Sequence, residues 1–138
     1  MVMVSYTHAF NYAIIGGASY PVLPIRISSA YSSDVKLDTD AYLDSGAQRS
    51  LFDGWIATAL GLDLLAGRDM TYASTSGAHI PAKLHHVRLF RPDLGNYELE
   101  IGFSLDRIAR NLLGRDFVAS VQIGFREQHL TFYIEPSP

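Results

Sequence analysis

Short segments in which apolar and polar residues alternate cover most of the chain. Alternation with a period of two predicts β-strands rather than helices. The segments with this pattern are 10–15, 22–27, 35–37, 41–43, 70–75, 78–90, 97–103, 121–125 and 130–134. Turn pairs at 16–17 and 76–77 join neighbouring strands into hairpins, with 22–27 as the returning strand of the first. Short strands at this spacing predict an all-β fold, a closed and mainly antiparallel barrel.

Helical spacing is clear in one segment, 52–60, where apolar residues recur every three or four positions. Gly61 follows in the position of a C-terminal helix glycine, and Ser50 or Asp53 can cap the start. This pattern predicts a helix of about two to three turns. A second, shorter helix is expected over 115–119, and 105–110 fits either a helical turn or a loop.

Composition limits the partners. The chain has 138 residues, a net charge of −3 and no cysteine. This length suits one domain over 1–138, with 1–9 as a loosely ordered arm. The negative charge argues against nucleic acid or an anionic membrane as partner, and the lack of cysteine excludes disulfides and Cys zinc sites. Because no signal peptide or membrane-spanning apolar run is visible, we expect a cytoplasmic protein without cofactor or metal.

Candidate chemistry begins at Asp44-Ser45-Gly46-Ala47, where an apolar strand ends in an acid. Ser45 can hydrogen-bond locally, Gly46 permits close backbone approach, and Ala47 leaves room beside the carboxylate. Alone, the triplet Asp-Ser-Gly is common, and a surface turn is its usual interpretation. A second notable stretch, Leu112-Leu113-Gly114-Arg115-Asp116, follows about seventy residues later, and a hairpin with the small polar tip Thr75-Ser76-Gly77-Ala78 lies between the two.

The order and spacing of these motifs resemble the retropepsin family of aspartic proteases, including bacterial and DNA-damage-inducible-type relatives. The resemblance runs from about residue 20 to about residue 134 and implies an acid-protease barrel with a flap hairpin. It assigns Asp44 as the catalytic aspartate and the hairpin tip as the flap. The implied active-site turn is Ser45, Gly46 and Ala47; the implied flap tip is Thr75, Ser76, Gly77 and Ala78; the implied bracing residues are Leu113, Gly114, Arg115 and Asp116. Gln48 and Tyr20 depart from the acid and the base that many retroviral members have at these positions.

Aspartic-protease chemistry needs two facing carboxylates, one ionised and one protonated, around one water. The chain has a single Asp-Ser-Gly, so the resemblance implies a homodimer with Asp44 from each subunit at the axis. Two carboxyl groups at such a short distance share one proton, and this predicts an activity optimum on the acid side of neutral. The expected function is an endopeptidase acting on extended peptides or unfolded proteins. The alternative is a catalytically silent dimerisation or peptide-binding module with the same fold.

Other interpretations use the same residues. His79, His85 and His86 are candidate metal ligands, but adjacent residues on a strand point to opposite faces, which favours ordinary strand histidines. Ser45 lacks the Gly-x-Ser-x-Gly context of a nucleophile. The Arg115-Asp116 pair can be an ordinary surface ion pair. The apolar face formed by Phe52 and Trp55 is expected in the core, with a partner surface as the alternative.

Overall fold

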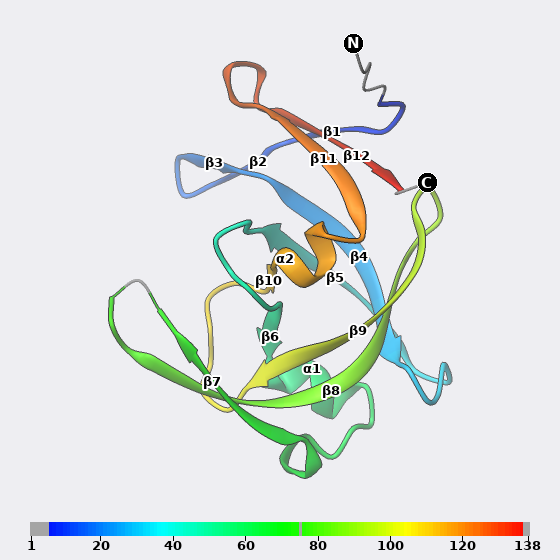
Figure 1. Ribbon diagram of the computed structural model, residues 1–138, viewed down its shortest axis with the longest axis vertical. Coiled ribbons are helices and arrows are strands. Elements are labelled where there is room, and N and C mark those ends of the chain that lie inside the picture. Colours follow the sequence, from blue (N-terminus) through cyan, green and yellow to red (C-terminus); the bar gives the residue numbers. More distant parts are fainter. Residues whose placement is uncertain (1–5, 75, 137–138) are drawn as a thin grey trace.

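The computed structural model describes residues 6–74 and 76–136. Its central feature is a closed ring of strands, in which each strand pairs with the next and β8 pairs again with β4 (Figure 1). In order around the ring, the strands are β4 (Val22–Ser29), β5 (Lys36–Leu43), β10 (Leu112–Leu113), β6 (Leu51–Asp53), β9 (Gly95–Ser104) and β8 (His79–Arg91). The pairings are antiparallel except for β5 with β10 and β6 with β9. The predicted all-β, mainly antiparallel barrel is therefore confirmed.

Alternation of buried and exposed side chains along parts of the ring strands builds the core. On β4, the side chains of Leu23, Ile25 and Ile27 are buried, whereas Pro24 and Arg26 between them are exposed. The same period holds on the neighbouring ring strands, so apolar side chains from all sides meet inside the barrel. Burial of this kind is the main stabilising contribution to such a fold.

The helix α1 (Gly54–Ala59) closes one end of the barrel. The carboxylate of Asp53 caps it by accepting a hydrogen bond from the Trp55 N–H at 3.1 Å. The helix is shorter than predicted, because Phe52 and Asp53 belong to β6, where Phe52 pairs with Phe103 of β9. A short 3-10 turn, η1 (Leu64–Ala66), leads from the helix towards β7. Residues 105–110 form a loop.

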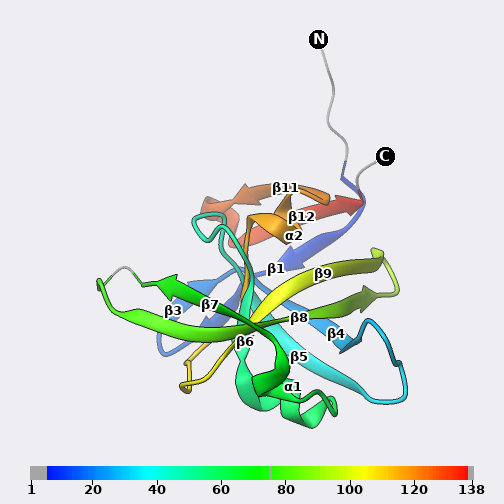
Figure 2. The same ribbon diagram turned by 60° about the horizontal axis from the view of Figure 1, so that its bottom comes forward.

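A second sheet lies across the other end of the barrel, with α2 beside it (Figure 2). Its strands are β1 (Ala9–Asn11), β12 (Thr131–Pro136) and β11 (Val121–Arg126), in the order β1–β12–β11 and all antiparallel. Strands β11 and β12 are joined by a 3-10 turn, η2 (Glu127–His129), and α2 (Arg115–Val118) precedes β11. Phe132 and Ile134 are fully buried and join the barrel core, so the two sheets share one apolar interior.

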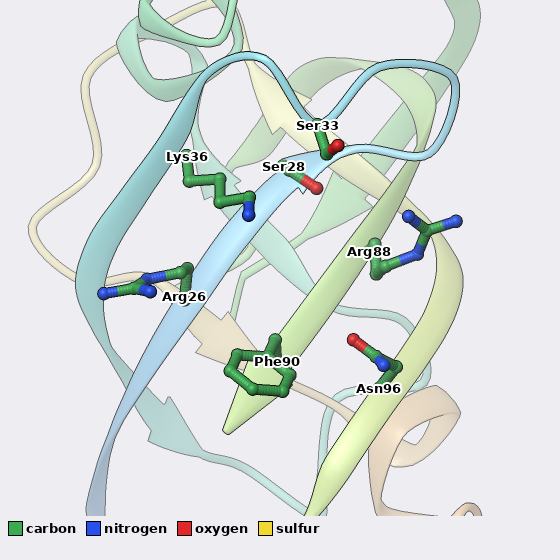
Figure 3. Close-up of a pocket in the computed structure, with 7 residues that line it drawn as sticks. All are labelled: Arg26, Ser28, Ser33, Lys36, Arg88, Phe90 and Asn96. Carbon is green, nitrogen blue, oxygen red and sulfur yellow. The ribbon is translucent and has the colours of Figure 1, made fainter. Parts of the chain in front are cut away.

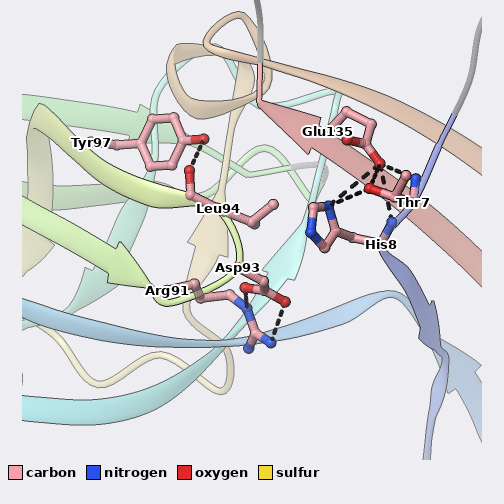
Figure 4. Close-up of polar contacts among 7 residues, drawn as sticks. All are labelled: Thr7, His8, Arg91, Asp93, Leu94, Tyr97 and Glu135. Carbon is pink, nitrogen blue, oxygen red and sulfur yellow. Dashed lines mark hydrogen bonds and ion pairs between the residues drawn. The ribbon is translucent and has the colours of Figure 1, made fainter.

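One carboxylate fastens the start of the described chain to β12. Glu135 accepts hydrogen bonds from the Thr7 N–H, from the Thr7 hydroxyl at 2.8 Å and from the His8 N–H at 3.0 Å (Figure 4). These contacts hold the pKa of Glu135 below its usual value, with the Thr7 N–H as the largest cause. In the neighbouring turn, Arg91 pairs with Asp93 through two hydrogen bonds of 2.9 and 3.1 Å.

The first predicted strand, 10–15, is in fact two strands that belong to different sheets. Its first half is β1, and its second half is β2 (Ala13–Ile15), which forms a separate hairpin with β3 (Ala18–Tyr20). The break falls at Tyr12, which is buried and whose hydroxyl donates to Glu127 at 2.6 Å. The returning strand of this hairpin is thus β3, and the predicted assignment of 22–27 to that place is wrong. Within the described residues, no helix is long and apolar enough to cross a membrane.

Candidate active site

Asp44 lies where β5 ends and the chain turns back. Its N–H donates to the carbonyl of Leu113 at 2.9 Å, continuing the parallel pairing of β5 with β10. Its carboxylate oxygen Oδ1 accepts the Gly46 N–H at 2.9 Å, and its carbonyl accepts the Ala47 N–H at 3.2 Å. A Cβ at position 46 would lie 3.2 Å from that same carboxylate oxygen. The turn therefore fixes both the backbone and the carboxylate of Asp44.

The second motif braces this turn from behind. Asp116 accepts hydrogen bonds from the Ser50 N–H at 2.9 Å and from the Ser50 hydroxyl at 2.7 Å. The same hydroxyl accepts the Gly114 N–H at 2.9 Å. The Arg115 N–H donates to the Ala47 carbonyl at 2.8 Å. Ser50, considered as a helix cap from the sequence, is instead the centre of this bracing network.

Glycine is required in that network for steric reasons. A Cβ at Gly114 would lie 2.8 Å from the Ala47 carbonyl oxygen and 2.9 Å from the Arg49 carbonyl carbon, both of them backbone atoms. Leu113, just before it, is fully buried. The side chain of Arg115 is exposed and makes no hydrogen bond with the described residues. The bracing contacts of this pair therefore come from the Arg115 main chain and the Asp116 side chain.

A cleft of ≈ 520 Å³ opens in front of Asp44. Its floor is the segment 44–51, and its wall is β7 (Arg68–Ala73), which pairs with the outer edge of β8. Met70, Ile80 and Leu112 give the cleft apolar surface. Such a cleft, mostly apolar with a few polar groups, has the character of a ligand-binding site.

The hairpin of β7 and β8 reaches over this region and ends in the small polar tip. The Ser74 N–H donates to the Ala78 carbonyl at 2.9 Å, and the Gly77 N–H donates to the Ser74 carbonyl at 3.0 Å. Gly77 has a φ of 83°, which glycine adopts without strain. Ser76 and Ala78 are exposed, whereas Thr75 lies outside the described residues.

Tyr72 ties this hairpin to the segment that follows the Asp44 turn. Its hydroxyl donates to the Ser50 carbonyl at 2.8 Å. Burial raises the pKa of Tyr72 to about 12, so the hydroxyl keeps its proton at physiological pH. Its ring lies against Gly102, where a Cβ would be 2.4 Å from the phenol oxygen. Nothing in the local sequence marks Tyr72, because its partners are Ser50, just before β6, and Gly102 of β9.

Arg49 was also not singled out by sequence reasoning, and it lines the cleft. Its Nη1 donates to the Glu100 carbonyl at 2.9 Å and to the Glu100 carboxylate at 3.3 Å. The same carboxylate pairs with Arg68. Arg49 thus belongs to the same loop as Asp44, lines the cleft, and is anchored by its guanidinium to Glu100 of β9.

Two of the histidines and several arginines elsewhere have partners of their own. In the part of the chain that the structure describes, no group of three or more His, Asp or Glu side chains could hold a metal ion. His85 Nε2 lies 2.9 Å from the Leu64 carbonyl, and His86 lies 3.2 Å from Glu100. A smaller cavity of ≈ 240 Å³ on the outer barrel face is lined by Arg26, Lys36 and Arg88 among others (Figure 3). There, Arg26 pairs with Asp38 and Arg88 pairs with Glu98, as cross-strand neighbours commonly do.

Solved structures match this fold. No protein-family model matches the chain, and no curated protein matches its sequence. A retropepsin-like aspartic protease from Rickettsia conorii matches with a TM-score of 0.63 and 18% identity, over 96% of this chain and 97% of that chain. EIAV protease, complexed with the inhibitor HBY-793, matches with a TM-score of 0.50 and 17% identity, over 78% of this chain and 92% of that chain. The chain therefore has the retropepsin-like aspartic protease fold, as predicted; a specific relationship to the DNA-damage-inducible-type proteins stays a prediction.

Proposed function

We propose that this chain is an aspartic endopeptidase, in which Asp44 from each of two identical subunits activates one water molecule. The observation that carries the proposal is the geometry of Asp44. Its carboxylate lines the cleft and is oriented by the Gly46 N–H at 2.9 Å, inside a turn that Ser50 and Asp116 brace from behind. A carboxylate held this firmly beside an open cleft is suited to proton transfer in a bound peptide complex.

The chemistry needs a pair of such groups. One Asp44 carboxylate takes a proton from the water, and the protonated Asp44 of the other subunit polarises the peptide carbonyl. Because two close carboxylates share a proton, the pair titrates as a unit and works best on the acid side of neutral. Activity that stayed flat from about pH 4 to 8 would contradict this proton-sharing pair.

The substrate that fits this cleft is an extended peptide. The cleft lies between the 44–51 segment and β7, so a peptide can lie along strand backbone and gain main-chain hydrogen bonds from it. The β7–β8 hairpin would act as a flap that closes over the peptide and excludes water. Apolar surface from Met70, Ile80 and Leu112 offers contacts for apolar side chains.

Two features support a second copy as partner. Ser45 is exposed beside Asp44, and its hydroxyl has no hydrogen bond to any described residue, so it is available to a facing loop. The β2–β3 hairpin projects on the same side of the molecule as the tip of the β7–β8 hairpin in both views (Figures 1 and 2). On that hairpin, the side chain of Ile14 is 75% exposed and that of Ile15 is 45% exposed. Exposed apolar side chains on this hairpin suggest a surface that a partner covers.

Replacement of Asp44 tests the function. Asp44→Asn keeps an oxygen that can accept the Gly46 N–H, so the variant should fold and dimerise yet lose cleavage of an unfolded protein substrate. Asp40→Asn is the matched control, because Asp40 is exposed on the same strand and does not line the cleft. If wild type and Asp44→Asn are equally inert while both dimerise, the protease proposal fails and the silent binding module is the better description.

A further inference from the structure

Charge is distributed unevenly in the cleft. Among the described residues that line it, Asp44 is the single carboxylate and Arg49 is the single cation. Arg49 lines the cleft, and its side chain is 35% exposed, so it is accessible to a ligand from solvent. The other lining residues are neutral. A bound peptide therefore meets one negative group, Asp44, and one positive group, Arg49.

Arg49 is anchored but not neutralised. Its Nη1 holds the Glu100 carbonyl at 2.9 Å and the Glu100 carboxylate at 3.3 Å, and a guanidinium has further N–H donors that these contacts leave over. The Glu100 carboxylate is also shared with Arg68, so one negative charge faces two permanent positive charges. This cluster therefore carries a net positive charge at the edge of the cleft.

Resting on the proposed function, we infer that Arg49 is a specificity-determining residue that selects peptides with an acidic side chain near the scissile bond. An anchored guanidinium recognises a carboxylate through short, charge-assisted hydrogen bonds. The shared negative charge of the Asp44 pair repels an acid at the scissile bond itself, so the preferred position is offset from it. Because a two-fold dimer presents Arg49 twice, an acid is favoured on either side of the bond.

Paired peptides test this preference. A set of fluorogenic peptides carries Glu or Gln at one position after another along a common cleavable sequence, and kcat/KM is measured for each pair. We expect a Glu-over-Gln preference of about tenfold at one or more offset positions. Arg49→Gln should bring the ratio to near one, and Arg49→Lys should retain part of it. Arg88→Gln is the matched control, because it removes the same charge from the outer barrel face and should leave the ratio unchanged.

Binding separates this inference from the proposed function. Labelled Glu and Gln peptides are titrated into the Asp44→Asn protein and into the Asp44→Asn/Arg49→Gln protein, and fluorescence anisotropy is recorded. Tighter binding of the Glu peptide to the first protein alone supports the inference whether or not the wild type cleaves. Equal binding of both peptides to both proteins, or a Glu preference that survives Arg49→Gln, overturns it. Cleavage by the wild type without any acidic preference would overturn the role of Arg49 and leave the protease proposal standing.

Discussion

Ser50 and Asp116 are joined by two hydrogen bonds, one from the Ser50 N–H at 2.9 Å and one from its hydroxyl at 2.7 Å. Ser50 follows the Asp44 turn, and Asp116 belongs to α2, so the pair connects two segments far apart in the chain. The Gly114 N–H completes the network by donating to the same hydroxyl at 2.9 Å. The position of the Asp44 turn thus depends on residues outside it.

Loss of the Ser50 hydroxyl should destabilise the fold. Ser50 is fully buried, and Ser50→Ala removes one hydrogen bond to Asp116 and leaves the buried Gly114 N–H without its acceptor. We expect a loss of about 2–3 kcal/mol in the free energy of unfolding, measured by urea denaturation. Ser45→Ala is the control and should change stability by less than about 0.5 kcal/mol, since Ser45 is exposed. Equal effects of the two changes would contradict the bracing role of Ser50.

Mixed dimers should reveal whether the site is shared. When wild-type protein is mixed with an equal amount of Asp44→Asn protein and allowed to exchange, only about one quarter of the dimers keep two Asp44 carboxylates. Activity per wild-type chain should therefore fall to about half, and it should fall further with excess variant. Bovine serum albumin added in place of the variant controls for dilution effects. Activity per wild-type chain that does not respond to the variant would mean that one chain carries a complete site.

An acid on the β2–β3 hairpin should weaken the dimer. Ile14→Asp places a charge where we propose an apolar partner surface, so sedimentation at graded concentrations should show a dissociation constant raised by about tenfold or more. Tyr31→Asp is the control, because Tyr31 is 81% exposed on another loop. If Ile14→Asp and Tyr31→Asp leave the dimer equally strong, the hairpin is not part of the interface.

Attachment of the N-terminal strand should depend on pH through Glu135. Its pKa is lowered in the folded chain, chiefly by the Thr7 N–H, so its contribution is fully present above its ordinary value of 4.5. That contribution is lost as the pH falls through the lowered value. Protection of the β1 amides against hydrogen exchange, taken relative to the intrinsic rate at each pH, should therefore fall at acidic pH. In Glu135→Gln this pH-dependent loss of protection should be absent; an unchanged profile in that variant would show that another group controls the strand.

Local patterns were sufficient to predict much of the fold. The alternation in 78–90 and the turn pair at 76–77 predicted the long β7–β8 hairpin, because antiparallel hairpins are specified by neighbouring residues. The same information failed at Tyr12, where one continuous β-pattern is divided between two sheets. A strand pattern predicts that a segment pairs, but it does not identify the partner strand. Here, strands far apart in the sequence determine where the segment is divided between the two sheets.

The candidate site also has residues that the sequence could predict and residues that it could not. Asp44 and its turn could be predicted because each small residue in Asp-Ser-Gly-Ala has a local role in the turn. Tyr72 and Arg49 could not, since Tyr72 contacts Ser50 and Arg49 contacts Glu100 of β9, and only the closed barrel creates these contacts. Ser50 was considered as a helix cap from its place before 52–60, whereas its hydroxyl bonds to Asp116, which lies much later in the chain.

The parallel pairing of β10 with β5 has a consequence for synthesis. The Asp44 N–H bonds to Leu113, which leaves the ribosome about 70 residues after Asp44, and chains grow at about 5–20 residues per second. For several seconds, a nascent chain therefore carries Asp44 without the strand that fixes its turn. Translation order alone therefore leaves this turn without its Leu113 partner until that residue has been made.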